Sequence, residues 1–188
     1  MKRIILASES PRRRELMMMM DIPFTTKPSH CEEYFNDQIA IPAAIEAIAT
    51  QKANAVLSTF PDEIIIGADT VVVIDGEVLG KPHEPEIAIE MLKRLSGRTH
   101  QVISAVSILS PLGNESFHVE TQVTFFPLSE EEIITYVNSK EPLDKAGAYG
   151  IQGKGAFLVE RIDGDYYNVM GLPISTLYRK LTKYIDRY

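Results

Sequence analysis

The sequence predicts an α/β or α+β fold built around a mixed β-sheet. Helical and strand-like patterns alternate in the first half of the chain, and β-prone runs cluster in the middle. The run Ile64–Ile74 is too continuously apolar for a surface strand, so we expect it in the centre of the sheet. With 188 residues, the chain can form one compact domain or two small lobes that share a core.

The elements of the first half follow from periodicity and from residues that begin or end helices. Pro11 suits a first helical position, Asp75–Gly76 is typical of a hairpin turn, and Ser96–Gly97 is typical of a helix C-terminus. Met17–Met20 are expected to fill the core, with a soft binding surface as the alternative. These signals predict strands at 2–7, 24–27, 64–74 and 77–79, and helices at 11–20, 42–57 and 85–95.

The second half combines long β-rich runs with a glycine-rich segment. A turn sequence at 111–114 separates two β-rich runs, which predicts a meander. Ser129 and Glu132 have the spacing of a capping box. Residues 143–155 show neither helical nor strand periodicity and predict a loop that can wrap a ligand. The predicted strands are 102–109, 116–126 and 156–162, and the predicted helices are 129–138 and 172–184.

Composition and charge exclude several classes of protein. The formal net charge of -7 argues against a broad surface for nucleic-acid polymers. Cys31 is the single cysteine, so neither an intramolecular disulfide nor a cysteine-based zinc cluster can form. The four histidines have no ligand spacing and are interpreted as surface residues. No segment resembles a signal peptide or a membrane span, so we expect a cytoplasmic, soluble protein with no membrane partner.

Three arginines occupy a helix start, where acidic residues are normally preferred. Arg12–Arg14 lie in the first turn after Ser10, where backbone N–H groups and the helix dipole already concentrate positive charge. This conflict predicts an anion site, and phosphate suits the planar fork of donors that arginine offers. The alternative is a solvated basic patch paired with Glu9 and Glu15.

Acidic side chains provide further candidates. Asp69 interrupts an apolar strand, so its carboxylate needs a cation or a hydrogen-bond network beside it; a structural contact with a backbone turn is the alternative. Glu32 and Glu33 are suited to bind Mg²⁺, or they belong to a solvated acidic loop. The sequence contains no P-loop, no nucleophile elbow and no dinucleotide-binding G-x-G-x-x-G after a strand.

Five short motifs occur in a fixed order along the chain. They are S-x-S-P-R-R at 8–13, G-A-D-T at 67–70, L-G-K-P at 79–82, D-K-A-G-A-Y-G-I-Q-G at 144–153 and G-L-P at 171–173. Each is weak alone, but the ordered set is specific and resembles the Maf nucleoside triphosphate pyrophosphatases over nearly the whole chain. The resemblance implies a single domain over residues 1–188. Its mixed α/β fold would have an elongated, twisted mixed sheet flanked by helices, with two lobes around a central cleft, similar to inosine triphosphatase. The protein would form a homodimer.

The resemblance also implies an activity. Proteins of this family hydrolyse a nucleoside triphosphate to the monophosphate and pyrophosphate with Mg²⁺ or Mn²⁺. Asp69 matches the family's general base, and Glu33 together with Asp69 would hold the metal. Lys52 and Lys81 would act in catalysis by neutralising charge as pyrophosphate leaves. The residues that would bind the phosphates are Ser8, Arg12 and Arg13, together with the two lysines.

Two positions resemble the branch of the family that acts on dTTP and UTP, with some activity on CTP or modified pyrimidine nucleotides. These are Thr70, directly after the matched aspartate, and Gln152 in the glycine-rich loop. A glutamine amide both donates and accepts, which suits a pyrimidine edge. Glu9 departs from the small or amide residue common in the family, which puts the charge around the phosphates in doubt. One alternative is a nucleotide-binding regulator of septum formation or cell division with incidental turnover. Another is a pyrophosphatase for inosine or xanthosine triphosphate, against which Gln152 argues.

Overall fold

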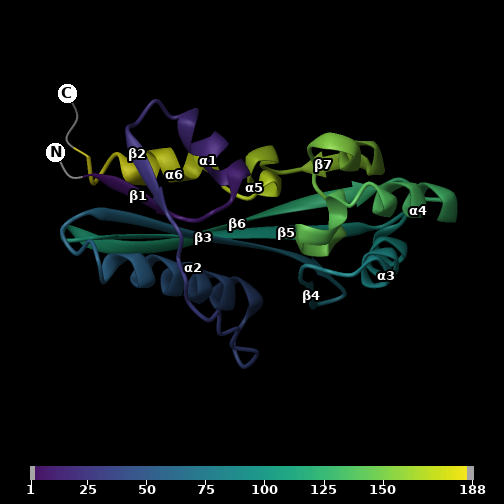
Figure 1. Cartoon of the computed structure of the whole chain (residues 1–188), viewed down its shortest axis with the longest axis horizontal. Helices are drawn as coiled ribbons and strands as arrows, with labels where there is room; N and C mark the ends of the chain where they lie inside the picture. Colours follow the sequence, from purple (N-terminus) through teal and green to yellow (C-terminus); the bar gives the residue numbers. More distant parts are fainter. Residues whose placement is uncertain (1–2, 186–188) are drawn as a thin grey trace. The chain divides into compact units, whose positions relative to one another are not determined.

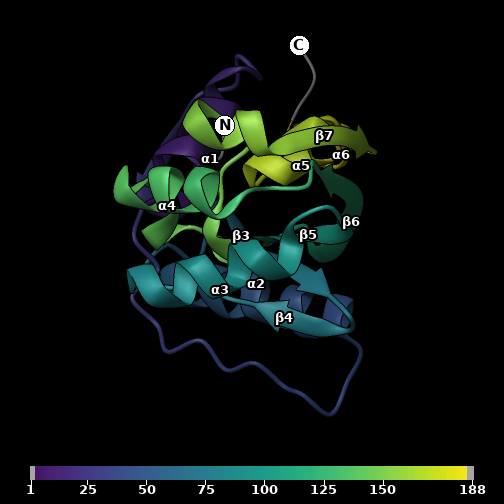
Figure 2. The same cartoon turned by 90° about the vertical axis from the view of Figure 1, so that its right-hand side faces the viewer.

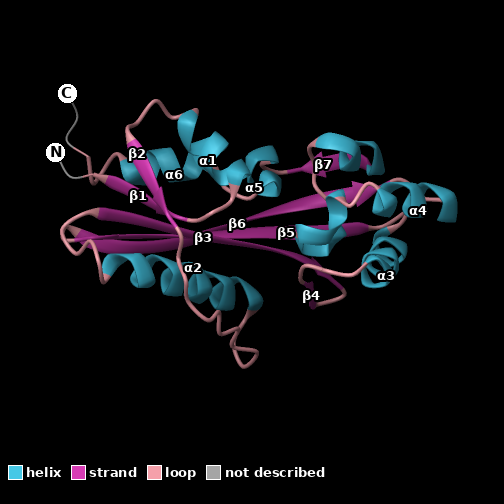
Figure 3. Cartoon of the chain, in the orientation of Figure 1, coloured by secondary structure: helices cyan, strands magenta, loops and turns pink. Residues whose placement is uncertain are grey.

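The computed structural model describes residues 3–185, whose strands form one mixed seven-stranded sheet (Figures 1 and 3). The strand order is β2-β1-β3-β5-β6-β7, and β4 pairs with β3. Strand β1 runs parallel to both neighbours, whereas β4 and β7 pair antiparallel with β3 and β6. The strands are β1 Ile4–Ala7, β2 Phe24–Lys27, β3 Ile64–Ile74, β4 Glu77–Leu79, β5 Thr99–Ser110, β6 Gly113–Phe125 and β7 Val159–Asp163. The predicted mixed sheet with an interior strand at 64–74 is therefore confirmed.

The helices begin largely where proline and capping residues predict. Ser10 and Ser129 both cap helices through their hydroxyls, and the capping box of Ser129 and Glu132 is complete. The α-helices are α1 Pro11–Met18, α2 Ile41–Leu57, α3 Pro85–Leu95, α4 Glu130–Asn138, α5 Tyr166–Met170 and α6 Ile174–Leu181. Among residues 3–185, none of these helices has the length and apolar character needed to cross a bilayer.

The chain divides into two compact units. Of the described residues, unit 1 contains those up to Thr70, Ser104–Val119 and those from Gly171 onward. Unit 2 contains Val71–Ile103 and Glu120–Met170. Strands β3, β5 and β6 therefore contribute residues to both units.

In unit 1, helix α2 covers one face of the strands and α6 covers the other (Figure 1). Successive side chains of β6 point to opposite faces of the sheet, so neighbouring residues contact different helices. The hydroxyl of Ser116 lies 3.2 Å from that of Thr50 on α2. The ring of the next residue, Phe117, lies 5.0 Å from the Lys180 ammonium of α6. Apolar side chains of β1, α2, β3 and β5 make up a core cluster: Ile5, Ala7, Ala53, Val56, Ile65 and Leu109.

In unit 2, α3 and α4 lie at the front in Figure 2 and share one apolar core. That core includes Leu92 and Leu95 of α3, Ile133 of α4 and Phe125 of β6. The glycine-rich segment contributes Ala148 and Tyr149 to the same core, so it is packed into the unit over part of its length.

The glycine-rich segment is more regular than its lack of periodicity indicates. Three short 3₁₀ helices lie within it or overlap its ends: η1 Glu141–Asp144, η2 Ala146–Ala148 and η3 Gly153–Leu158. Because η3 extends to residue 158, the following strand begins at Val159 and not at the predicted Ala156. The five-residue helix α5 was not predicted from the sequence, since it is too short to show a helical period.

Two sequence-based expectations about single side chains are wrong. Met17 is buried, but Met18 and Met19 are 60% and 55% exposed. Successive residues of a helix point to different sides, and α1 ends at Met18, two residues before the predicted end. His100 is only 2% exposed and is not a surface residue. Its strand begins at Thr99, three residues earlier than predicted, which carries His100 into the sheet.

Candidate active site

The site begins with a nearly buried lysine on α2 that meets two carboxylates. Lys52 is 8% exposed, and its Nζ lies 2.6 Å from Asp69 Oδ1 and 2.9 Å from Glu33 Oε1. Of the partners that the sequence left open for Asp69, the structure shows a cation. The side chain of Glu33 is half exposed and comes from the loop before α2, so it is the accessible member of the group.

The ion pair depends on a close approach between α2 and β3 at Gly67. A Cβ atom on Gly67 would lie 2.1 Å from the carbonyl oxygen of Ala49 and 2.8 Å from the backbone nitrogen of Ala53. The helix backbone therefore rests directly on the strand one turn before Lys52. Gly67 and Asp69 point to the same face of β3, so this contact brings the lysine to the carboxylate.

Arg13 fixes the strand on either side of Asp69. Its Nη1 donates to the carbonyl of Ala68 at 2.9 Å, and its Nη2 donates to Thr70 Oγ1 at 3.1 Å. Its Nε donates to the carbonyl of Gly171 at 2.9 Å. Burial lowers the pKa of Arg13 and the nearby Asp69 carboxylate opposes that shift, while guanidinium groups stay charged in proteins. Arg13 therefore holds β3 and Gly171 in place through these hydrogen bonds. Its predicted phosphate contact stays a prediction.

The start of α1 presents further polar groups beside a cavity of about 250 Å³. Ser10 Oγ accepts from the backbone N–H of Arg13 at 3.4 Å, and the nearly buried Ser8 Oγ accepts from the N–H of Ser10 at 3.2 Å. Ser8, Ser10 and Arg14 line the cavity together with Glu9 and Glu15. Both charge signs therefore border it, and the contribution of Ser8 and Arg12 to phosphate binding stays a prediction.

The other two predicted residues, Lys81 and Gln152, belong to unit 2. Lys81 is exposed and Gln152 is half-buried. The backbone N–H of Gly147 donates to the carbonyl of Gly80 at 3.0 Å, which connects the glycine-rich segment to the residue before Lys81. A Cβ atom on Gly147 would lie 2.7 Å from Val72 Cγ2, so the segment is pressed against β3 at this point.

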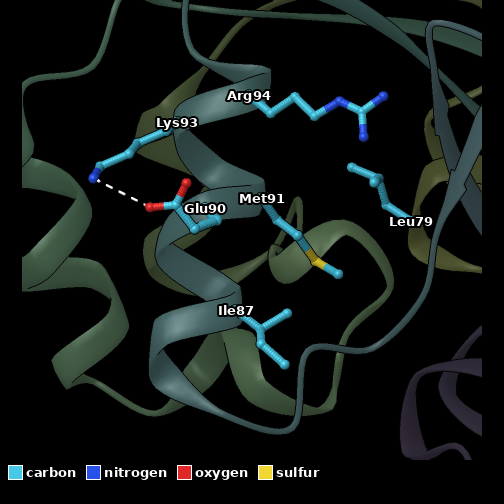
Figure 4. Close-up of a pocket in the computed structure, with 6 residues that line it drawn as sticks. All are labelled: Leu79, Ile87, Glu90, Met91, Lys93 and Arg94. Atoms are coloured by element: carbon cyan, nitrogen blue, oxygen red, sulfur yellow. Dashed lines mark hydrogen bonds and ion pairs between the residues drawn. The ribbon is translucent and has the colours of Figure 1, made fainter.

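A wider cavity of about 470 Å³ lies between α3 and β4 (Figure 4). Leu79, Ile87 and Met91 form its apolar side, while Glu90 and Lys93 pair with each other at 3.3 Å. Arg94 is held by Glu77 at 2.7 Å. Neither Lys81 nor Gln152 lines this cavity, so it is separate from the predicted chemistry.

His100 is a buried polar residue whose role the sequence did not reveal. Its Nε2 lies 2.8 Å from the hydroxyl of Tyr149, and its ring packs edge-on against Tyr149 and Phe125. Burial lowers the pKa of His100 to about 4 and raises the pKa of Tyr149. Both rings are therefore neutral at pH 7, and the contact is a neutral hydrogen bond that holds the glycine-rich segment to β5.

A protein-family model described as "Maf-like protein" matches residues 3–184. The chain belongs to the Maf family. The match spans both units and nearly all described residues, so the family resemblance of the five motifs is confirmed over residues 3–184.

Named relatives of this Maf protein agree with each other. A "dTTP/UTP pyrophosphatase" of Bacillus velezensis is 55% identical over 183 residues, which cover 97% of each chain. A protein of the same name from Bacillus cereus is 50% identical over 184 residues, 98% of this chain and 96% of the relative. The Staphylococcus aureus Ham1 protein, a solved structure, matches with a TM-score of 0.57 at 17% identity and covers 98% of this chain and 100% of its own. That likeness shows the fold alone.

Proposed function

We propose that this Maf protein hydrolyses dTTP and UTP to the monophosphate and pyrophosphate. The observation that carries the proposal is the group formed by Lys52, Asp69 and Glu33, in which a nearly buried ammonium lies between two carboxylates. The names of the 55% and 50% identical relatives support the choice of reaction and substrates.

The proposed catalytic and phosphate-binding residues have different roles in this reaction. Asp69 accepts the proton of the water that attacks the α-phosphate. Lys52, and Lys81 from unit 2, neutralise the negative charge that develops as pyrophosphate leaves. Ser8, Arg12 and Arg13 bind the phosphate oxygens, and arginine is suited to this because its donors form a planar fork.

The proposed metal is Mg²⁺ or Mn²⁺, held by Glu33 and Asp69. The donor set fits, because oxygens of both carboxylates already meet at one cationic group, the Lys52 ammonium. Among residues 3–185, no cluster of three or more histidine, cysteine, aspartate or glutamate side chains could hold a metal. Substrate phosphate oxygens and water would therefore complete the shell, as is common for Mg²⁺. A metal bound there would neutralise phosphate charge and make a nearby water more acidic.

Base selection is assigned to Thr70 and Gln152. The Thr70 hydroxyl is held by Arg13 and lies 2.8 Å from Ser104 Oγ, so its orientation is fixed in advance. The Gln152 amide can donate to a carbonyl and accept from an N–H, which uracil and thymine present side by side. Thymine and uracil differ from cytosine at these groups, so an amide held in one orientation would favour dTTP and UTP over CTP.

The test is an incubation of the purified protein with Mg²⁺ and a panel of nucleoside triphosphates, with the products separated by chromatography. Monophosphate plus pyrophosphate from dTTP and UTP is the expected result. A preference for a purine would overturn the substrate assignment. Tight nucleotide binding without turnover would support the regulator of septum formation or cell division instead.

Two further proposals concern the state of the protein. We propose that it is a homodimer, as the family resemblance implies, and sedimentation velocity would test this by giving the mass of a dimer or of a single chain. We also place its action in the cytoplasm, because nucleoside triphosphates are its proposed substrates. A fluorescent fusion that accumulates elsewhere would contradict that location.

A further inference from the structure

In unit 2, residues 150–155 of the glycine-rich segment wrap around the carboxylate of a single residue, Glu141. Glu141 Oε2 accepts from the backbone N–H of Lys154 at 3.1 Å, and Oε1 accepts from the N–H of Gly155 at 3.2 Å. Oε1 also accepts from the hydroxyl of Tyr136 at 3.1 Å. That hydroxyl in turn accepts from the N–H of Gly150 at 3.2 Å. We call Glu141 and Tyr136 the clasp.

Two glycines of the segment are explained by their distance to the clasp. Gly153 has a φ of +66°, and a Cβ atom there would lie 2.8 Å from Glu141 Oε2. A Cβ atom on Gly155 would lie 2.7 Å from the Tyr136 hydroxyl and 2.1 Å from the carbonyl oxygen of Gly150. The glycines therefore allow the backbone to close around the carboxylate, where larger residues would hold it away.

The clasp itself is firmly placed. The backbone N–H of Glu141 donates to Ser139 Oγ at 3.3 Å, and its carbonyl accepts from Lys145 Nζ at 2.5 Å. Tyr136 is 4% exposed and lies on α4 in the apolar core. Burial raises the pKa of Tyr136, so it remains a phenol that donates to the carboxylate. Charge-assisted bonds of this kind are stronger than neutral ones.

Gln152 lies between the two points at which the clasp holds the segment. On one side the N–H of Gly150 is bound, and on the other side those of Lys154 and Gly155 are bound. The backbone that carries the Gln152 amide is thus fixed from both flanks, although the clasp does not bond to the amide itself.

We propose that Glu141 is a positioning residue for Gln152 and thereby sets the discrimination between uracil or thymine and cytosine. The proposal rests on the proposed function, in which the Gln152 amide contacts the base. Glu141 acts through the loop and does not contact the reacting phosphates. Its loss changes which base is accepted, and the phosphate chemistry stays intact.

The test compares kcat and KM for dTTP and CTP in the wild-type protein and in Glu141→Gln. The substitution keeps the shape of the side chain but replaces one acceptor oxygen by an NH₂ group, which faces backbone N–H donors. We expect the preference for dTTP over CTP, measured as the ratio of their kcat/KM values, to fall about tenfold. The change should appear as a higher KM for dTTP, and kcat should be largely unchanged. Glu160→Gln, an exposed acid on β7, is the matched control and should leave the preference unchanged.

A double-variant comparison separates positioning from general loosening of the fold. In a Gln152→Ala background, Glu141→Gln should cause no further loss of preference, because the two residues act through one contact. If Glu141→Gln does not fold, Tyr136→Phe tests the same clasp and should lower the preference by a smaller factor.

Three outcomes would overturn the proposal, and they are distinguishable. If the wild-type protein hydrolyses neither dTTP nor UTP, the proposed function fails, and the role of Glu141 fails with it. If dTTP turnover is intact but the clasp variants keep the wild-type preference, the role of Glu141 alone fails. Full additivity with Gln152→Ala also contradicts it.

Discussion

Asp69 in unit 1 and Glu141 in unit 2 are two carboxylates held in very different ways. Asp69 meets a nearly buried ammonium at 2.6 Å, so one side chain compensates its charge. Glu141 meets two backbone N–H groups and a phenol, so the chain around it is shaped by the carboxylate. The first arrangement holds a reactive charge in place, and the second uses a charge to shape a loop.

The largest expected effect comes from removing the charge of Asp69. Asp69→Asn keeps the size of the side chain but cannot accept the proton of an attacking water. We expect kcat for dTTP to fall about 10³-fold. Steady-state kinetics measure the effect, and Asp62→Asn, an exposed residue of the same unit, is the control. A kcat within a few-fold of the wild type would remove Asp69 from the chemistry and end the contrast with Glu141.

Acid sensitivity should be concentrated in unit 2, at His100. Its pKa is about 4 in the folded protein and 6.5 in the unfolded chain, so between these values the unfolded state binds the extra proton. Stability is therefore lost as the pH falls from 6.5 to 4, by about 3 kcal/mol from this residue. Urea unfolding at both pH values measures the loss.

His100→Gln should remove that pH-dependent part, while His30→Gln, an exposed residue, should keep it. An unchanged difference between the two pH values in His100→Gln would show that the His100–Tyr149 contact does not control the acid response.

Gly67→Ala tests whether the Asp69–Lys52 pair depends on backbone contact. The added methyl group would lie 2.1 Å from the carbonyl oxygen of Ala49, so α2 must move away from β3. We expect a loss of about 2 to 3 kcal/mol in the free energy of unfolding, together with reduced kcat. Gly80→Ala, where a Cβ atom meets nothing within 4 Å, is the control for stability alone. Wild-type stability in Gly67→Ala would contradict the close approach.

The smallest expected effect is that of Arg13→Lys. Lysine keeps the charge but cannot reach the carbonyls of Ala68 and Gly171 and the Thr70 hydroxyl at once. The free energy of unfolding should fall by about 1 to 2 kcal/mol. Arg12→Lys, on the same helix, should be milder, and equal losses in the two variants would argue against an organising role special to Arg13.

The two carboxylates also show how far the sequence predicts the site. A lone aspartate in an apolar strand needs a cation, a hydrogen-bond network or a backbone turn beside it. The sequence therefore predicted that Asp69 has a partner, but it did not decide among these three. Gly67 in the same strand was a further signal of close backbone approach, although it did not identify α2 as the neighbour.

The clasp and His100 were not predictable in this way. Every residue except proline has a backbone N–H group, so the sequence does not indicate which of these groups donate to a given side chain. The bonds from Lys154 and Gly155 to Glu141 could therefore not be predicted. The burial of His100 follows from where β5 begins, and strand ends are poorly marked by periodicity. The exposure of Met18 and Met19 was missed because their apolar character was considered without the geometry of the helix.

The most direct measurement is kcat and KM for dTTP and CTP in the wild-type protein, Asp69→Asn and Glu141→Gln, in one assay that also identifies pyrophosphate as product. We expect Asp69→Asn to lose kcat on both nucleotides by the same factor and to keep the wild-type preference. We expect Glu141→Gln to keep kcat and to lower the preference for dTTP over CTP. A Glu141→Gln variant that loses kcat equally on both nucleotides, or an Asp69→Asn variant that retains turnover, would contradict these roles.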